Sequence, residues 1–443
     1  MAPGKDDSSK AASELQYAPA TLGIHGDDPL NSSTDVAPPM HVSTTFRYSH
    51  NPDELVPGED EEASATLLQG LRCPLTFHQL TGFEPHVYSR LSAPNTSRLE
   101  RILSRLCHGQ ALTYSSGLSS FHAMCVLLRP KVVAIYEGYH GCHGVLGILE
   151  RLYGVKKVDL RDESAWDAAG LGKGDMVHVE TPLNPTGEAY NLAEFAEKAH
   201  KRGAYLTVDA TFGPPGLQDP FEWGADVVMH SGTKYVGGHS DMLCGVLVVR
   251  RKDWFQQLYT DRIFLGSVMG SFEGWLGVRS LRTLELRVQR QSKNTEALVS
   301  WLDGLMRAGS GEEGAAVAVS DDAIVVKELV ARLQHASLQK KDMGWLKKQM
   351  PNGFGPVFTI WMRDRETAKR LPSKLKLFHH ATSLGGAESL IEWRRMSDRT
   401  VDDRVMRLSI GVEDFQDLKS DLLNGMRELA KELRLGGKAQ ARL

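Results

Sequence analysis

Short apolar runs rich in valine and isoleucine alternate with amphipathic segments from about Tyr88 onward, and this alternation constrains the fold more than any other feature. The runs predict strands at 111–117, 131–136, 175–182, 204–212, 225–231 and 243–249. Helical periodicity predicts a helix before the first strand, at 97–106, and helices between strands at 118–128, 145–154 and 192–203. Nearly continuous apolar strands separated by helices are typical of a mostly parallel sheet covered on both faces, so we expect an α/β fold.

The pattern changes past about residue 271, where a long helical stretch precedes isolated strands at 356–362 and 405–411. These elements and a final helix predict a smaller α+β domain. We therefore divide the chain into a disordered tail (1–16), an N-terminal arm (17–83), a large domain (84–280) and a C-terminal domain (281–443). The acidic stretch 53–64 within the arm predicts an exposed loop.

The composition argues against nucleic-acid-binding, membrane-spanning and disulfide-stabilised proteins. The formal net charge is −3, and no apolar run approaches the ~20 residues of a membrane span. The N-terminus has no apolar signal segment. The cysteines lie far apart and form no C-x-x-C pair: Cys73, Cys107, Cys125, Cys142 and Cys244. They indicate reduced thiols, so we expect a cytoplasmic protein.

Two chemically suggestive residues follow neighbouring predicted strands. One strand ends at Asp209, and the next is followed by the run from Ser231 to Lys234. Ligands of such sheets lie beyond the carboxyl ends of the strands, so both side chains should reach the same crevice. A lysine amine that can form an imine, with an acid for a pyridine nitrogen, suits pyridoxal phosphate (PLP).

Other residues fit the same cofactor. The run SSGLSS, starting at Ser115, joins a strand to a helix and offers backbone amides to a phosphate, and Gly117 permits close backbone approach. The Tyr139 ring could stack on the cofactor, and the Asn184 amide could reach its phenolic oxygen. The fork of Arg407 suits an α-carboxylate. Each signal alone is more typical of surface charges, helix caps and turns; their order and shared placement support the hypothesis.

The motifs around these residues resemble those of the Cys/Met-metabolism PLP enzymes, which include the cystathionine synthases and lyases. The most specific blocks are HSGTKYVGGHSD (230–241) and SLGGAESLIE (383–392). Further blocks follow in the family's order: VSTTF (42–46), YSR (88–90), YSSG (114–117), ETPLNPTG (180–187), VDATF (208–212), RSLRTLELR (279–287) and RLSIGVEDFQDL (407–418). The resemblance covers roughly residues 17 to 430.

The resemblance implies a fold-type I PLP enzyme, usually a homotetramer built from dimers, acting on a small amino-acid substrate. It makes Lys234 the Schiff-base lysine and proton shuttle, and Tyr139 a stacking residue that can act as acid or base. The expected cofactor-binding residues are Lys234, Asp209, Ser116, Gly117, Leu118, Tyr139, Asn184, Thr211, Ser231, Thr233, Tyr88 and Arg90. Of these, Tyr88 and Arg90 would reach into the neighbouring subunit. The expected substrate-binding residues are Arg407, Ser383, Thr382 and Asn184.

The sequence departs from the family pattern at three places. After YSR the order of Pro94, Asn95 and Thr96 differs from the usual Asn-Pro-Thr. The run 140–143, His-Gly-Cys-His, replaces a glycine after the stacking tyrosine. It lacks a fourth zinc ligand, so we expect no metal and a substrate-facing loop. Thr382 stands where several family members that handle cystathionine carry glutamate, which leaves room for another nucleophile or leaving group.

The function expected from the resemblance is γ-replacement: an O-acyl-homoserine would lose its acyl group and gain a thiol, as in cystathionine γ-synthase, or another nucleophile. A C–S lyase that works by β- or γ-elimination remains an alternative, because the same residues serve both reactions. A non-catalytic PLP-binding relative is the alternative from another class. The presence of Lys234, Asp209 and Arg407 together argues against it.

Overall fold

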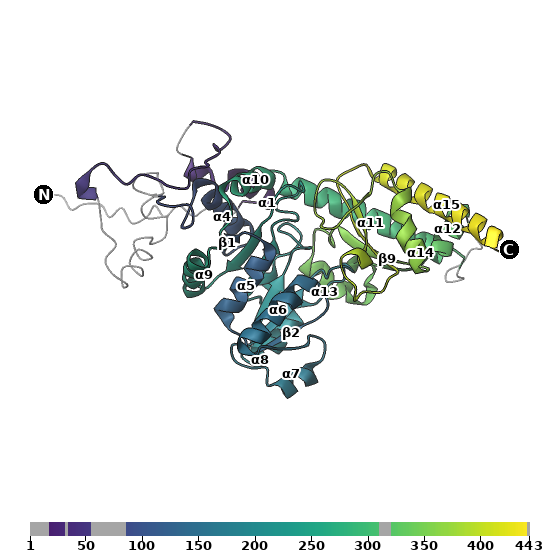
Figure 1. Cartoon of the computed structure of the whole chain (residues 1–443), viewed down its shortest axis with the longest axis horizontal. Coiled ribbons are helices and arrows are strands. Elements are labelled where there is room, and N and C mark those ends of the chain that lie inside the picture. The colour runs from purple at the N-terminus through teal and green to yellow at the C-terminus, as the bar shows by residue number, and fades with distance from the viewer. Residues whose placement is uncertain (1–16, 32–33, 55–85, 310–319, 441–443) are drawn as a thin grey trace.

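A computed structural model of the chain describes residues 17–31, 34–54, 86–309 and 320–440. A seven-stranded sheet forms the centre of a large domain, and a five-stranded sheet forms the centre of a smaller C-terminal domain (Figure 1). The expected α/β class, with a mostly parallel large-domain sheet and a smaller α+β domain, is confirmed. No helix in the described ranges is both long enough and apolar enough to span a bilayer.

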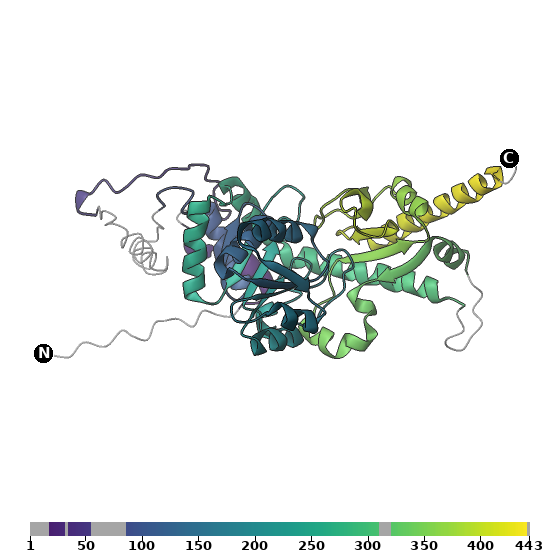
Figure 2. The ribbon, with the colours of Figure 1, turned by 60° about the horizontal axis from the view of Figure 1, so that its bottom comes forward.

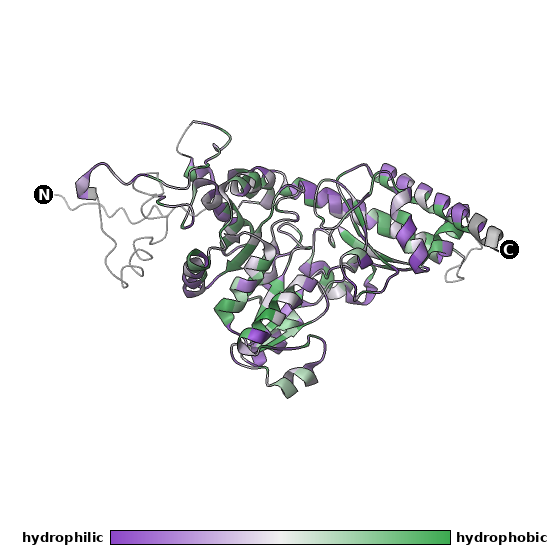
Figure 3. Ribbon diagram, in the orientation of Figure 1, coloured by the Kyte–Doolittle hydropathy of each residue, from purple (hydrophilic) through white to green (hydrophobic). Residues whose placement is uncertain are grey.

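The large-domain sheet places the carboxyl ends of its central strands at one edge. Its strands are β1 (Gln110–Tyr114), β2 (Val132–Ile135), β3 (Lys156–Asp159), β4 (Met176–Glu180), β5 (Tyr205–Asp209), β6 (Val227–Ser231) and β7 (Gly245–Val249). Their order is β1-β7-β6-β5-β4-β2-β3, and β7 alone runs in the direction opposite to the other strands. The ends of β4, β5 and β6 therefore meet, and their apolar strands lie inside the domain (Figure 3).

Helices pack on this sheet and on one another. They are α4 (Pro94–Leu106), α5 (Gly117–Leu128), α6 (His140–Tyr153), α7 (Glu163–Ala169), α8 (Leu192–Lys201), α9 (Lys252–Leu265) and α10 (Ser271–Leu281). In α4 the apolar side chains at helical spacing, Leu99, Ile102 and Leu106, are all buried. The helix α6 begins earlier than expected. Residues 140–143, expected as a loop, are its first turn, and Cys142 packs in the core.

The N-terminal segment is anchored to the large domain rather than wholly irregular. It contains α1 (Pro19–His25), which contacts α4 and buries Leu22. Asp27, 1% exposed, forms ion pairs with Arg98 and Arg282. The acidic stretch 53–64 lies mostly outside the described residues. Short 3-10 helices lie at Asp28–Leu30, Pro52–Glu54, Pro220–Trp223, Ala336–Leu338, Lys340–Asp342, Leu371–Lys374 and Arg394–Met396.

The C-terminal domain is joined to the large domain through one long helix, α11 (Leu284–Arg307) (Figure 2). Leu284 and Val288 belong to the large-domain core, whereas Leu298 and Leu302 belong to the C-terminal core. The remaining elements are α12 (Asp321–Leu329), β8 (Val330–Gln334), α13 (Met343–Gln349), β9 (Val357–Met362), α14 (Arg365–Arg370), β10 (His379–His380), β11 (Leu390–Trp393), β12 (Val405–Ser409) and α15 (Phe415–Gln440). The second sheet has the order β10-β11-β12-β9-β8.

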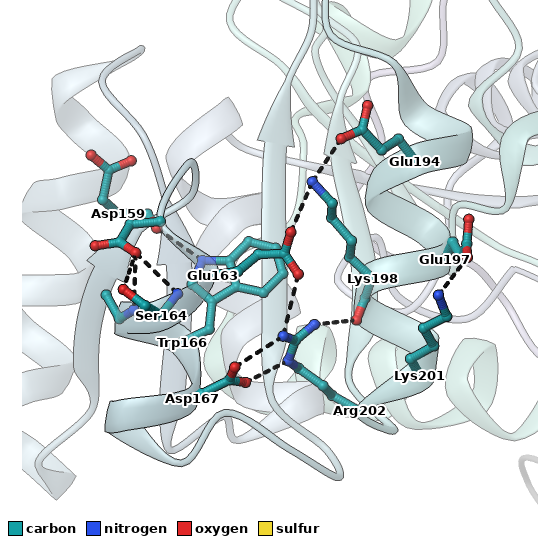
Figure 4. Close-up of polar contacts among 12 residues, drawn as sticks. Asp159, Glu163, Ser164, Trp166, Asp167, Glu194, Glu197, Lys198, Lys201 and Arg202 are labelled. Atoms are coloured by element: carbon teal, nitrogen blue, oxygen red, sulfur yellow. Dashed lines mark hydrogen bonds and ion pairs between the residues drawn. The ribbon is translucent and has the colours of Figure 1, made fainter.

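A surface network joins α7 to α8 (Figure 4). Arg202 donates to Asp167 at 2.9 Å and pairs with Glu163 at 3.3 Å. Its guanidinium also lies 5.3 Å from the centre of the Trp166 ring. Lys198 adds ion pairs with Glu163 and with α8's own Glu194.

Replacing Arg202 with alanine is expected to lower the free energy of unfolding by about 1 kcal/mol. The acidic partners are solvent-exposed, so most of this loss comes from uncovering the buried Trp166 ring. Urea denaturation followed by tryptophan fluorescence measures it. Lys201→Ala, which removes only an exposed i,i+4 pair with Glu197, is the matched control and should have a smaller effect.

Candidate active site

Asp209 ends β5 and is held in place by Thr211. The Thr211 amide and hydroxyl both donate to Asp209 Oδ1, at 3.0 and 2.5 Å. The Thr211 hydroxyl also accepts from the Ser231 amide at 2.8 Å, which links the ends of β5 and β6. Burial raises the pKa of Asp209 to about 6, although the Thr211 bonds and Lys234 oppose the rise. Both bonds use Oδ1, so Oδ2 keeps its capacity to accept from a protonated ring nitrogen.

Lys234 follows β6 and lies against a loop of the C-terminal domain. Its Nζ atom donates to Ser383 Oγ at 2.6 Å. Gly385 packs so closely on Lys234 that an added Cβ would lie 2.9 Å from the Lys234 Cα, and its φ of +91° favours glycine. Burial, followed by the charge of Arg407, lowers the pKa of Lys234 to about 8. The amine is therefore far more nucleophilic near neutral pH than a solvent-exposed lysine.

In the apoenzyme, capture of an aldehyde by Lys234 should become faster with rising pH and reach half its maximal rate near pH 8, because only the neutral amine attacks. Stopped-flow absorbance after mixing with PLP across a pH series measures this midpoint. Arg407→Gln should move the midpoint upward, since it removes a cation that disfavours the charged amine. A wild-type midpoint near that of free lysine would contradict the prediction.

The turn before α5 forms a cradle beside Ser231. Ser116 is the N-cap of α5 and accepts from the Ser119 amide at 3.1 Å, so the free amides of Gly117 and Leu118 lie at the positive end of the helix. A Cβ on Gly117 would lie 3.1 Å from both Cβ and Oγ of Ser231. Only glycine leaves this space open.

The hydroxyl of Thr233 is occupied elsewhere. It donates to the Cys244 carbonyl at 3.3 Å and accepts from the Cys244 amide at 3.1 Å. In this arrangement the Thr233 hydroxyl ties the turn after β6 to the residue before β7, and the Ser231 hydroxyl faces Gly117.

Glu180, at the end of β4, holds two of the expected site residues and is not itself among the residues expected from the sequence. Its Oε2 atom accepts from the Tyr139 amide at 2.8 Å, and its Oε1 atom accepts from the Asn184 amide at 2.7 Å. A Cβ on Gly138, whose φ is +90°, would lie 2.4 Å from Oε2. Burial and neighbouring Asp209 raise the pKa of Glu180 to about 8. The strand-end rule that selects Asp209 also selects Glu180.

Arg407, on β12, connects the two domains at the expected carboxylate site. Its guanidinium donates to Asn184 Oδ1 at 3.1 Å and to the Ser383 carbonyl at 2.8 Å. It also pairs with Glu392, its register partner on β11, at 2.6 Å. Burial lowers the pKa of Arg407 to about 10, although Glu392 opposes the shift. Thr382, beside this group, is exposed.

Two of the expected cofactor-binding residues lie apart from the other site residues of the same chain. Tyr88 forms an isolated β-bridge with Thr45, and Arg90 donates to the Ile263 carbonyl at 3.1 Å on α9. In the turn 140–143, the His143 ring contacts backbone carbonyls of the preceding turn. Within the described ranges, no group of three or more His, Cys, Asp or Glu side chains is arranged to hold a metal.

The assembled groups match the functional groups of PLP. Lys234 offers an amine to the aldehyde, and Asp209 Oδ2 offers an acceptor to the ring nitrogen. The cradle at Gly117 supplies amides to a phosphate, and the 39% exposed Tyr139 offers a ring face. When bound, the cofactor supplies an electron sink for the electron pair left at the substrate's Cα.

The chain's own residues can perform the accompanying proton transfers. The lowered pKa of Lys234 lets its Nζ atom take a proton at neutral pH and return it. Ser383 keeps that atom beside the carboxylate site, where Arg407 can orient a substrate. Burial raises the pKa of the Tyr139 hydroxyl, so this group holds its proton and can donate it.

Known proteins share both this sequence and this fold. The family model described as Cys/Met metabolism PLP-dependent enzyme matches residues 20–427. The chain is 32% identical over 417 residues to cystathionine gamma-synthase of Escherichia coli, covering 89% of this chain and 94% of the relative. It is 30% identical over 361 residues to cystathionine gamma-lyase of Bacillus subtilis, covering 78% and 88%.

The structural comparison agrees. Cystathionine gamma synthase from Xanthomonas oryzae pv. oryzae, solved with aminoacrylate and cysteine, aligns with a TM-score of 0.75 at 25% identity, covering 94% of this chain and 99% of that one. The relatives include both synthases and lyases. The chain therefore belongs to the Cys/Met metabolism PLP-dependent enzymes, and it is a PLP-dependent transferase or carbon–sulfur lyase.

Proposed function

We propose that this enzyme catalyses γ-replacement on an O-acyl-homoserine, expelling the acyl group and adding a thiol or another nucleophile at Cγ. The observation that carries the proposal is the junction of Lys234 with the carboxylate site: Nζ lies 2.6 Å from Ser383 Oγ, and Ser383 is held by Arg407. A proton-transferring amine beside a carboxylate anchor suits an amino-acid substrate whose Cα and Cβ protons both move. The similarity to a gamma-synthase over nearly its whole length supports the same reaction type.

The pocket leaves the nucleophile open. Thr382 is exposed and carries no charge, so it offers no counter-ion to a distal ammonium group. The proposal therefore includes acceptors other than cysteine, such as a different thiol or a carbon nucleophile.

The reaction type is tested by adding O-acetyl-homoserine to the holoenzyme with and without cysteine, while ammonia and thiol are followed. We expect thiol consumption that depends on O-acetyl-homoserine, with little ammonia. Elimination releases ammonia and a keto acid, so ammonia without thiol loss would assign the enzyme to the lyases. Holoenzyme that binds PLP and turns over no amino acid would favour the non-catalytic alternative. A panel of further nucleophiles then identifies the acceptor.

We also propose that two chains share each active site within a dimer, and that dimers pair into a tetramer. Arg90 contacts α9 beside Phe264 and Leu265, which are 78% and 52% exposed in the single chain. A second chain packed against this end of α9 would cover both apolar side chains. The four cysteines of the described ranges are free and buried, which supports the cytoplasmic location that we propose.

If two chains share each active site, two inactive variants should complement each other. Arg90→Ala and Lys234→Ala homodimers should both be inactive. Unfolding and refolding them together should restore about one quarter of wild-type activity, because half of randomly paired dimers are mixed and each has one intact site. Activity recovery after co-refolding measures this, and two lots of the same variant refolded together provide the control. Full activity of Arg90→Ala alone would contradict site sharing.

A further inference from the structure

A buried group of three charged side chains lies behind the carboxylate site. Glu392 Oε2 accepts from Arg394 Nη1 at 2.8 Å and pairs with Arg407 Nη2 at 2.6 Å. The three residues are 2%, 3% and 5% exposed respectively, so solvent screens them little. Glu392 lies on β11, Arg407 lies opposite it on β12, and Arg394 begins the turn after β11.

The charges in this group do not cancel. One carboxylate faces two guanidiniums, and the pKa of Glu392 is lowered because Arg407 and Arg394 outweigh its burial. A guanidinium group is a cation at neutral pH. Buried charge without a partner is costly, so a group with one excess positive charge favours an incoming anion. The Nε atom of Arg394 is also buried and lacks a hydrogen-bond partner among the described residues.

The two arginines have different surroundings. Arg407 reaches Asn184 and Ser383, which are site residues, whereas the hydrogen bond of Arg394 goes to Glu392. Without Arg394, Glu392 would neutralise Arg407, and a substrate carboxylate would meet a group with no net charge. Two other acids interact with Arg394, Asp398 and Glu180. Asp398 is partly exposed and is held by Thr400, and burial raises the pKa of Glu180 to about 8, which leaves Glu180 mostly uncharged at neutral pH.

We propose that Arg394 determines recognition of the substrate's carboxylate: it neutralises Glu392 and so leaves the charge of Arg407 for the ligand. Arg394 is a positioning residue that acts through Glu392. The inference rests on the proposed function in one respect, that Arg407 binds the α-carboxylate of an amino-acid substrate.

The test is equilibrium binding of L-alanine and of L-alaninamide to the holoenzyme, followed by the absorbance of the bound cofactor. Arg394→Gln should weaken L-alanine binding by about 10- to 100-fold, as expected for loss of a charge-assisted contact. It should leave the affinity for L-alaninamide, which has no carboxylate, nearly unchanged. Arg394→Lys should retain most of the affinity. Arg395→Gln, a neighbouring exposed arginine, is the matched control and should bind as wild type does.

The decisive variant is the double substitution Glu392→Gln with Arg394→Gln. It restores one net positive charge, so we expect it to recover most of the lost L-alanine affinity although it removes two native side chains. A purely structural role for Arg394 predicts that the double variant is at least as impaired as Arg394→Gln. That result would overturn the proposal.

The remaining outcomes also decide the question. If Arg394→Gln does not fold, Glu392→Gln alone provides the test: it raises the excess charge and should bind L-alanine at least as tightly as wild type, and weaker binding would overturn the proposal. The assay requires no turnover, so the inference survives if γ-replacement is not observed. A wild-type holoenzyme that binds no amino acid would overturn the proposed function and the inference together.

Discussion

Replacing Lys234 with alanine is expected to reduce turnover by about a thousand-fold or more, because in the proposed function the same Nζ atom would hold the cofactor and transfer the proton. The fold should persist, since the amine's one side-chain hydrogen bond, to Ser383 Oγ, involves an exposed serine. Steady-state assay with O-acetyl-homoserine and cysteine measures the loss. The variant should still bind PLP, more weakly and without the absorbance of a lysine imine.

Lys252→Ala is the matched control for Lys234→Ala. Lys252 is the exposed first residue of α9, and its loss changes the net charge by the same amount. It should leave both turnover and the cofactor spectrum unchanged. Turnover in Lys234→Ala close to that of Lys252→Ala would remove Lys234 from the reaction.

The second large effect is expected from Asp209→Asn. The amide cannot stabilise a protonated ring nitrogen as a carboxylate does, so turnover should fall by about 100- to 1,000-fold. Thr211→Val, which keeps the carboxylate and removes the hydroxyl that holds Oδ1, should have a smaller effect. Asp162→Asn changes an exposed helix cap and should leave the kinetic constants unchanged. Unaltered turnover in Asp209→Asn would contradict its assignment.

Although Asp209→Asn should lower turnover, it should raise the stability of the folded apoenzyme at pH 8. Burial raises the pKa of Asp209 from 3.8 to about 6, so the folded apoenzyme binds this proton more tightly than the unfolded chain. The stabilisation that comes from the protonated form is present at low pH and is lost as the pH rises through about 6. The neutral asparagine avoids that loss. Apo Asp209→Asn should therefore melt higher than wild type at pH 8, with the difference disappearing at acid pH, as differential scanning calorimetry can show.

The parts of the site that the sequence predicts are those set by topology. In a parallel sheet, residues that follow neighbouring strands must lie together, so Asp209 and Lys234 could be paired without coordinates. Glu180 obeys the same rule. The sequence does not single out Glu180, because it stands as the first residue of the block ETPLNPTG. Its hydrogen bonds go to backbone amides, which no motif specifies.

Other features depend on tertiary contacts that local patterns do not contain. The pairing of Glu392 with Arg407 depends on the antiparallel register of β11 and β12. The turn 140–143 is helical although Gly141 lowers its helix propensity, because Cys142 and Leu146 pack into the core. The strand β3, not anticipated, is a mostly exposed edge strand that lacks the apolar signature of its neighbours.

The long helix α11 has a consequence for exchanging parts between relatives. Lys234 and the strand-end acids Asp209 and Glu180 lie in the large domain, whereas Arg407 and the buried charges behind it lie in the C-terminal domain. A chimera that combines this chain's large domain with another enzyme's C-terminal domain would therefore exchange Arg407 and the charges behind it, and would keep Asn184, the large-domain partner of Arg407. Because α11 contributes side chains to both cores, the splice belongs ahead of Leu284, where the helix begins, so that the helix is inherited whole.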